Sequence, residues 1–87
     1  SITEENEKHI IDIYPNPNNG FFNISITSEL YQNSLLEIYD SSGKLVFKQI
    51  LVNEINTIGI PNLNYGIYTL KILNNSNLIK IGKLIKQ

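Results

Sequence analysis

Seven short apolar segments, separated by clusters of Asn, Ser, Gly and Pro, most constrain how this chain of 87 residues folds. Short strands bounded by turn residues at this spacing are typical of a β-sandwich. No segment keeps a helical period over several turns. Ile is the most frequent residue, with 16 copies, and Ala is absent. Because Ile is β-branched and Ala is the best helix former, the composition indicates the same class.

We therefore expect an all-β fold, a seven-stranded antiparallel Ig-like β-sandwich with Greek-key connections. The expected strands are Ile10–Tyr14, Phe21–Thr27, Leu35–Tyr39, Leu45–Val52, Asn56–Ile60, Ile67–Leu73 and Leu78–Lys86. Asp40–Lys44 predicts a tight hairpin with Gly43 in the left-handed position, and Asn74–Asn77 predicts a second hairpin loop. One-face alternation is expected in the last two strands, for Tyr68, Leu70 and Ile72 and for Ile79, Ile81 and Ile85.

The chain divides into a polar leader, residues 1–9, and one domain, residues 10–87. The leader is rich in charge and lacks an apolar period. Processing of a folded domain requires an extended accessible segment, and in this sequence the leader is the segment that fits. We expect a processing site there.

The segment Tyr14–Phe22 combines two prolines, three asparagines and a glycine. Pro15 and Pro17 each fix φ and favour extended conformations for the preceding residue. Asn18, Asn19 and Gly20 can then reverse the chain, because Asn tolerates and Gly favours positive φ. The segment predicts a rigid corner leading into a strand.

The net charge of −1 argues against a nucleic-acid partner. Charge is uneven along the chain, since acids gather near the start and Lys80, Lys83 and Lys86 lie within the last ten residues. The simplest interpretation is a pair of solvated termini. No apolar run is long enough for a membrane-spanning helix, so no transmembrane segment is expected.

The catalytic inventory is small, because the chain has no Cys, no Arg and a single His, His9, in the leader. We predict no enzymatic activity, no cofactor and no metal. Asp12, Asn16, Asn18 and Asn19 form the one arrangement that suggests calcium, but a single carboxylate is poor for that ion, and turn chemistry explains these residues as well. Tyr31, Tyr39, Tyr65 and Tyr68 leave a sugar-binding face open as an alternative.

Four motifs occur in order along the chain. They are Tyr-Pro-Asn-Pro-x-x-Gly-x-Phe from Tyr14, Asp-x-x-Gly-Lys from Asp40, Leu-x-x-Gly-Ile-Tyr from Leu63, and an apolar tail with spaced lysines. In this order and spacing they resemble the type A C-terminal sorting domain of type IX secretion system cargo, over about Ile10 to Gln87. The final pattern differs in part, since Gly82 precedes Lys83 where the family often has a second Lys, and Gln87 follows the last Lys.

The resemblance implies a non-catalytic C-terminal secretion signal with the sandwich fold expected above. Its partners would be the type IX outer-membrane translocon, a shuttle protein, a sortase-like peptidase and an N-terminally fused cargo domain. The cargo would be exported through the periplasm to the cell surface or the medium, and the peptidase would usually remove the domain and anchor the cargo. The alternatives are a fibronectin-like or carbohydrate-binding accessory module of an extracellular enzyme, or an adhesin module that self-associates through an edge strand.

The residues that match the family's motifs become the expected contacts with the translocon. They are Tyr14, Pro15, Asn16, Pro17, Gly20, Gly66, Tyr68, Lys80, Lys83, Leu84, Ile85 and Lys86. The last strand, if it lies at a sheet edge, could extend a partner's sheet through free N–H and C=O groups, with its lysines preventing indiscriminate pairing. Gly82 then indicates a bulge or a close backbone approach in that strand.

Overall fold

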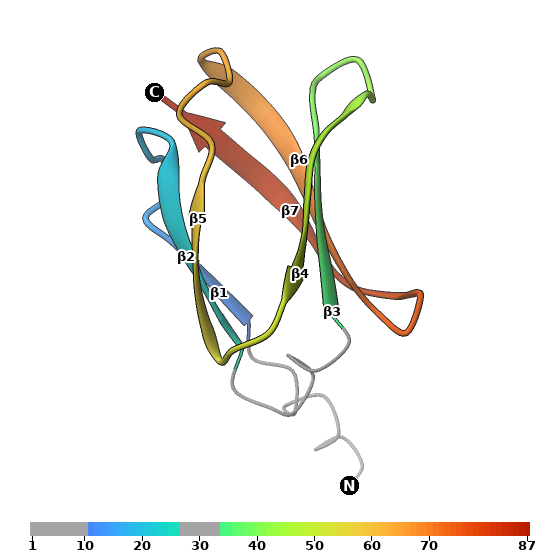
Figure 1. Ribbon diagram of the computed structural model, residues 1–87. Helices are drawn as coiled ribbons and strands as arrows, with labels where there is room; N and C mark the ends of the chain where they lie inside the picture. The colour runs from blue at the N-terminus through green and yellow to red at the C-terminus, as the bar shows by residue number, and fades with distance from the viewer. Residues whose placement is uncertain (1–10, 27–33) are drawn as a thin grey trace, which may run out of the picture.

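The computed structural model describes residues 11–26 and 34–87. Within them the chain forms two antiparallel sheets that face each other (Figure 1). One sheet has the order β1-β2-β5 and the other β4-β3-β6-β7. The strands are β1 (Ile11–Tyr14), β2 (Phe21–Ile26), β3 (Ser34–Tyr39), β4 (Leu45–Leu51), β5 (Ile55–Gly59), β6 (Gly66–Asn74) and β7 (Asn77–Lys86).

The all-β class and the seven strands agree with the sequence prediction, and each end that can be compared is correct to within one residue. The expected strand residues Ile10 and Thr27 lie outside the described residues, as do the leader 1–9 and the segment 28–33. Pro61 follows the end of β5, consistent with the inability of proline to donate to a strand ladder.

The core lies between the two sheets and consists mainly of the residues that face inward at alternate positions along the strands. In β2 and β6 the alternation is regular, so Tyr68, Leu70 and Ile72 are all buried, as predicted. The buried hydrophobic residues are Ile11, Phe22, Ile24, Ile26, Leu36, Ile38, Leu51, Ile58, Ile60, Tyr68, Leu70, Ile72 and Leu84. Removing such apolar surface from water is the main favourable contribution to folding.

The expected face of β7 is wrong. Ile79 packs against the core, but Ile81 and Ile85 pair with Lys71 and Ile67 on the outer side of the sheet. The register skips a residue at Ile79, because Lys80 is opposite Ile72 while Leu78 is opposite Leu73. One extra residue exchanges the two faces of a strand, so the inward positions after the irregularity are the even-numbered ones.

Gly82 has neither property expected of it. The irregularity in β7 lies at Ile79, and a Cβ built on Gly82 would meet no atom within 4 Å. Gly82 pairs in regular register with Leu70.

Both predicted hairpin turns are present. Gly43 has φ of 90°, and the Asp40 carboxylate accepts hydrogen bonds from the N–H groups of Ser42 and Lys44, each at 2.9 Å. In the second hairpin Asn75 and Ser76 have φ of 52° and 71°. Positive φ at both central residues of a two-residue loop matches the right-handed twist of the flanking strands.

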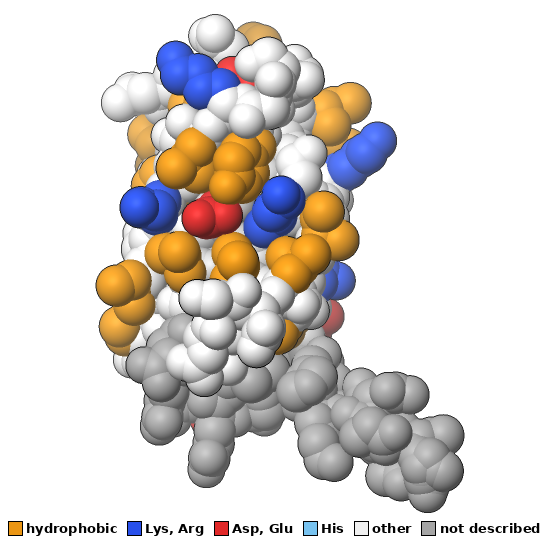
Figure 2. Space-filling view, turned by 90° about the vertical axis from the view of Figure 1, so that its right-hand side faces the viewer, with side chains coloured by type: hydrophobic (Ala, Val, Ile, Leu, Met, Phe, Trp, Pro, Cys, Tyr) orange, Lys and Arg blue, Asp and Glu red, His pale blue; other side chains and the backbone are white. Residues whose placement is uncertain are grey.

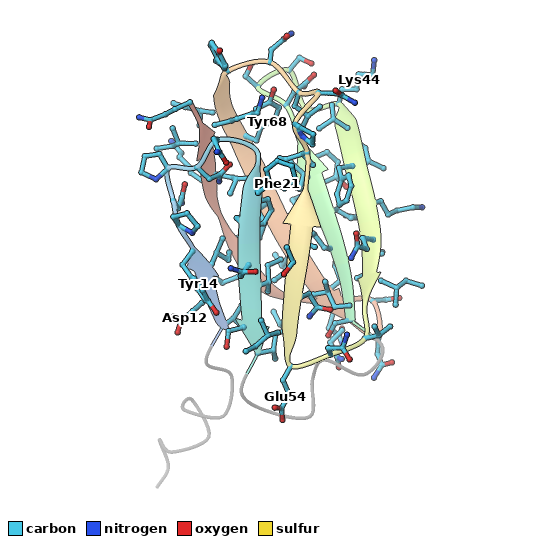
Figure 3. All side chains as sticks on the ribbon, turned by 60° about the vertical axis from the view of Figure 1, so that its left-hand side comes forward. Asp12, Tyr14, Phe21, Lys44, Glu54 and Tyr68 are labelled. Carbon is cyan, nitrogen blue, oxygen red and sulfur yellow. The ribbon has the colours of Figure 1, made fainter. Side chains whose placement is uncertain are left out.

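Tyr68 joins β6 to the turn before it. Its ring is buried near one end of the sandwich, and Glu54 lies at the other end (Figure 3). The Tyr68 hydroxyl donates to the Asn64 carbonyl oxygen at 2.6 Å. The bond fixes the path of the chain as it crosses from the three-stranded sheet to the four-stranded one. A hydroxyl here costs little to bury because it has a partner.

Tyr68→Phe is expected to lower the free energy of unfolding by about 1 kcal/mol, because one buried hydrogen bond is lost and the ring stays. Urea unfolding followed by circular dichroism measures the change. Tyr65→Phe is the matched control, since Tyr65 is 80% exposed and should unfold like the wild type. Equal unfolding of the two variants would contradict the structural role of the Tyr68 hydroxyl.

Asp40 makes the stability pH-dependent. Hydrogen bonds from Ser42 and Lys44 hold the pKa of the Asp40 carboxyl below its usual range. A carboxyl with a lower pKa in the folded state stabilises the fold above its unfolded pKa of about 3.9, and this contribution is lost as the pH falls through the folded value.

Asp40→Asn is therefore expected to unfold more easily than the wild type at about pH 7, and the difference should shrink at about pH 3. Urea midpoints at both pH values measure it. A difference that stays constant with pH would show that the carboxylate charge has no part in holding this turn.

Candidate functional site

The end of β7 is the candidate site, because three segments that are distant in the sequence meet there. These are the β1–β2 connection, the turn after β5, and residues 83–87 at the end of β7 (Figure 1). We call the arrangement the terminal clasp. It is formed by Asn16, Asn18, Gly20, Pro61 and Leu63 around residues 83–87.

Asn16 binds the free edge of β7 with both ends of its carboxamide. Its Nδ2 donates to the Lys83 carbonyl oxygen at 2.8 Å, and its Oδ1 accepts from the Ile85 N–H at 2.9 Å. The side chain thus substitutes for a neighbouring strand at two successive edge positions. The flanking Tyr14–Pro15 and Asn16–Pro17 bonds are both cis.

Asn18 continues this pairing with its main chain. Its N–H donates to the Ile85 carbonyl oxygen at 2.9 Å, and its own carbonyl accepts from the Gln87 N–H at 2.7 Å, which makes a parallel bridge with Lys86. Its side chain stays inside the loop, where Oδ1 accepts from the Gly20 N–H at 2.8 Å. The polar side chain can be buried because its Oδ1 accepts this bond and its Nδ2 donates to the Pro15 carbonyl oxygen at 3.4 Å.

Gly20 is the closest contact point of the clasp. It has φ of 114°, and a Cβ at this position would lie 3.0 Å from both Lys86 Cε and Pro61 Cα. Both the positive φ and the close contacts disfavour a side chain at this position. The carbonyl of Gly20 accepts from the Ile60 N–H, which joins the loop to the end of β5.

Lys86 lies inside the clasp and is only 6% exposed. Its Nζ donates to the carbonyl oxygens of Pro61, at 3.1 Å, and Leu63, and it lies 5.5 Å from the centre of the Tyr65 ring. A buried ammonium is costly unless its donors are satisfied, and here main-chain carbonyls and an aromatic face supply the partners. The interpretation of Lys86 as a solvated terminal charge is therefore wrong.

Most of the residues predicted to contact the translocon lie at this end of the sandwich. Gly66 pairs with Lys86, and Tyr68 pairs with Leu84, so the Gly-Ile-Tyr motif adjoins the clasp through β6. Lys80 does not belong to this group, since it is opposite Ile72 farther along β7. Tyr14 is partly exposed on β1 and points outward beside Asp12 (Figure 3). That these residues contact the translocon stays a prediction.

The edge-strand hypothesis needs correction. β7 does lie at a sheet edge, but four of its outer groups are bonded to Asn16 and Asn18. They are the Lys83 carbonyl, the N–H and carbonyl of Ile85, and the Gln87 N–H. Its lysines do not form one row either, since Lys83 faces outward and Lys86 faces inward. This half of β7 cannot extend another sheet while the clasp is closed.

Sequence reasoning missed the acceptors of Lys86 and the cation–π partner Tyr65. Pro61 and Leu63 accept hydrogen bonds through their main-chain carbonyls, which every residue type has. Their side chains therefore gave no indication that they bind Lys86. Lys86 gave no signal either, because its inward position, two residues after the buried Leu84, follows from the register of β7.

Neither ligand alternative gains support from these positions. The Asn16 and Asn18 carboxamides are used in protein hydrogen bonds, and in residues 11–26 and 34–87 no group of three or more His, Cys, Asp or Glu side chains could hold a metal ion. The tyrosines form no common platform, because Tyr68 is buried, Tyr65 is in a loop, and Tyr39 on β3 bonds Glu37. Tyr31 lies outside the described residues.

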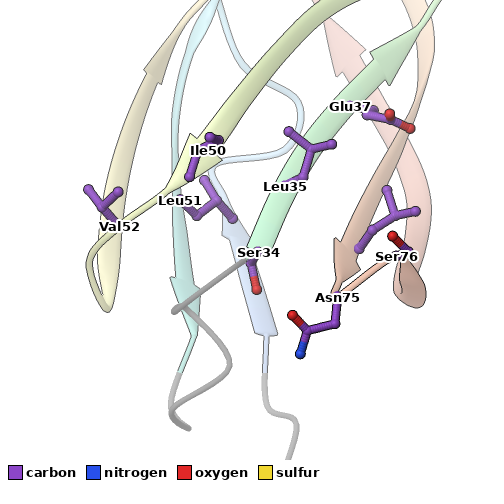
Figure 4. A pocket seen from close by; sticks show the side chains of 9 residues that line it. Ser34, Leu35, Glu37, Ile50, Leu51, Val52, Asn75 and Ser76 are labelled. Carbon is purple, nitrogen blue, oxygen red and sulfur yellow. The ribbon is translucent and has the colours of Figure 1, made fainter.

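A groove of about 750 Å³ lies away from the clasp (Figure 4). Its lining includes Ser34, Leu35, Ile50, Leu73 and Ser76, and it shares no residue with the predicted recognition set. Over the part of the chain that the structure describes, no helix is long and apolar enough to cross a membrane.

The fold and the clasp define a small β-sandwich whose last strand is locked to the β1–β2 connection. The family of secretion system C-terminal sorting domains matches residues 12–87. The chain belongs to this family, and it is a type IX C-terminal sorting signal.

Among curated proteins, none matches the chain. Among solved structures, it is similar to the crystal structure of CopC from Methylosinus trichosporium OB3b, with 24% identity and a TM-score of 0.56 over 87% of this chain and 88% of that chain. At this level of identity the similarity concerns the fold alone.

Gly20→Ala is expected to lower the free energy of unfolding by roughly 1–3 kcal/mol, because it combines positive φ with contacts to Pro61 and Lys86. Urea unfolding of the 87-residue chain measures it. Gly82→Ala is the control on the partner strand, where a methyl group meets nothing within 4 Å, and it should be neutral or slightly stabilising. If both variants behaved alike, the tight packing at Gly20 would be refuted.

Proposed function

We propose that this domain directs an N-terminally fused cargo through the outer-membrane translocon of the type IX system, and that it does so as a non-catalytic, folded signal. The observation that carries the proposal is the terminal clasp. The Tyr-Pro-Asn-Pro-x-x-Gly motif and the lysine-spaced tail, about 67 residues apart, bind each other directly through Asn16. Two motifs that the chain shares with the family thus form one structural unit, the terminal clasp.

A folded signal suits a translocon that must accept varied cargo. A rigid surface loses little conformational entropy on binding, whereas a flexible tail would have to be ordered at a cost. The clasp supports rigidity, since the last residues of β7 are hydrogen-bonded on both sides, to β6 and to the β1–β2 connection.

The connectivity we propose is Ig-like and Greek-key. Support comes from the strand order β1-β2-β5 and β4-β3-β6-β7, in which consecutive strands change sheets after β2, β4 and β5. The Tyr68 hydroxyl, bonded to the main chain four residues upstream, resembles the tyrosine corner of immunoglobulin-type sandwiches.

The roles of the individual residues divide into two groups in this proposal. Asn16, Gly20, Leu84 and Lys86 hold the terminal strand in place, since their contacts lie within the domain. Residues with exposed side chains, such as Tyr14, Pro15, Pro17 and Lys83, remain available to a partner. Export would proceed through the periplasm to the cell surface or the medium.

Processing would take place in the leader, residues 1–9, ahead of the first strand. A sortase-like peptidase would cut there and anchor the cargo at the surface, and a shuttle protein would carry it between translocon and peptidase. Support comes from family membership and from the position of the leader before β1.

The proposal is tested by export of a periplasm-targeted reporter fused to residues 1–87. We expect extracellular reporter in a type IX-competent strain and periplasmic reporter in an isogenic strain without the translocon. The reporter without the domain is the control and should stay in the periplasm of both. A folded fusion retained in the periplasm of the competent strain would overturn the proposal.

A further inference from the structure

We propose that the outward-facing residues of β7 and its neighbour β6 form the docking surface for the translocation machinery. This outer β7 surface consists of Ile67, Ile81, Lys83 and Ile85. Its partner is a protein surface with carboxylates opposite the lysine and apolar side chains on either side of them. The inference rests on the proposed function and specifies which side of the terminal strand is recognised.

The register separates folding from recognition within β7. Leu84 and Lys86 point inward and are buried, whereas Ile81, Lys83 and Ile85 alternate with them on the outside. Cross-strand partners share a face, so Ile67, opposite Ile85, belongs to the same outer surface. In the sequence the tail looks uniformly apolar and basic. In the structure the inner face of β7 packs within the domain and its outer face is exposed to solvent.

This outer face carries exposed apolar side chains. Ile67 is 54% exposed and Ile81 is 56% exposed. Figure 2 shows the outer face of the four-stranded sheet, on which apolar side chains gather in bands, with a row of lysines and an acidic side chain between them. Lys83 lies between Ile81 and Ile85 along the strand, so exposed apolar side chains flank a charged one. Exposed apolar side chains gathered on one face are typical of an interaction site.

The charge of this region indicates an acidic partner. β6 and β7 contain no Asp or Glu, and Lys83 lies opposite the neutral Thr69 on the outer face. On the adjoining β3, Glu37 accepts a hydrogen bond from the Tyr39 hydroxyl and lies between Lys48 and Lys71 in register. Carboxylates on the partner would complement Lys83 and favour docking in one orientation.

The clasp holds this surface in a fixed conformation. Asn16 bonds the main-chain groups of Lys83 and Ile85, whose side chains point outward. The backbone of the surface is therefore ordered before a partner arrives, and binding loses little further entropy. This explains how a motif in the β1–β2 connection can affect recognition without touching the partner.

The test compares two matched double variants in the reporter fusion. Ile81→Thr/Lys83→Gln changes the outer β7 surface, and Ile50→Thr/Lys48→Gln makes the same changes on β4 at the opposite edge of the sheet. Both isoleucines are exposed, at 56% and 63%, so both variants should fold. We expect at least tenfold less extracellular reporter from the β7 variant and wild-type export from the β4 variant.

Urea unfolding of both variants accompanies the export assay. If the β7 variant is exported as well as the wild type, the docking inference is overturned while the wild-type fusion still tests the proposed function. Equal loss of export in both variants would also overturn it, since the effect would then not be local to β7. If export is lost and unfolding shows that the β7 variant is no longer folded, the single variant Lys83→Glu at the exposed surface decides instead.

A charge series at Lys83 tests the chemistry of the partner. Lys83→Arg should retain export, Lys83→Gln should lower it, and Lys83→Glu should lower it further, because repulsion replaces attraction. The same export from all three variants would exclude an acidic partner. A dimer of the 87-residue chain that Ile81→Thr/Lys83→Gln disrupts would assign this surface to self-association and overturn the proposal.

Discussion

The last strand of the sandwich is hydrogen-bonded on both of its sides, and this pairing fixes the position of the terminal residues. β6 pairs with one side of β7, and the Asn16 side chain and Asn18 main chain pair with the other. The two sheets are thereby joined at one corner, since the loop belongs to the three-stranded sheet and β7 to the four-stranded one. A small domain buries only a modest core, and this one has no Cys and therefore no disulfide. A contact between distant segments therefore adds a constraint on the chain that the core alone does not supply.

The positively charged Lys86 side chain is buried in the clasp, although none of its hydrogen bonds to the described residues goes to a carboxylate. Its stem packs against Gly20, and its ammonium meets the carbonyls of Pro61 and Leu63 and the face of Tyr65. The arrangement is specific, because an ammonium in this position is acceptable only when the loop, the turn and β7 are all in place. A lysine near the end of the family motif therefore contributes to the fold, and the outer face of the strand takes no part in the clasp's side-chain contacts.

Much of the fold was predictable, and the failures have physical causes. The strands, the Asp40–Lys44 turn and the inward face of β6 follow from short-range rules on alternation and turn chemistry. The face of β7 was predicted wrongly because a single extra residue at Ile79 reverses the alternation, and no residue type in that segment signals it. The contacts of Asn16 were equally hidden, since they link residues far apart in the chain.

The all-β class, the seven strands, the two tight turns and the resemblance to sorting domains can all be predicted from the amino-acid sequence, because each depends on local conformational preference or on motif order. Which residues of the terminal motif are buried follows from the tertiary structure alone. Leu84 and Lys86 became part of the fold, while Ile81 and Lys83 stayed outside. That division depends on strand register and on packing between distant segments, neither of which a local pattern specifies.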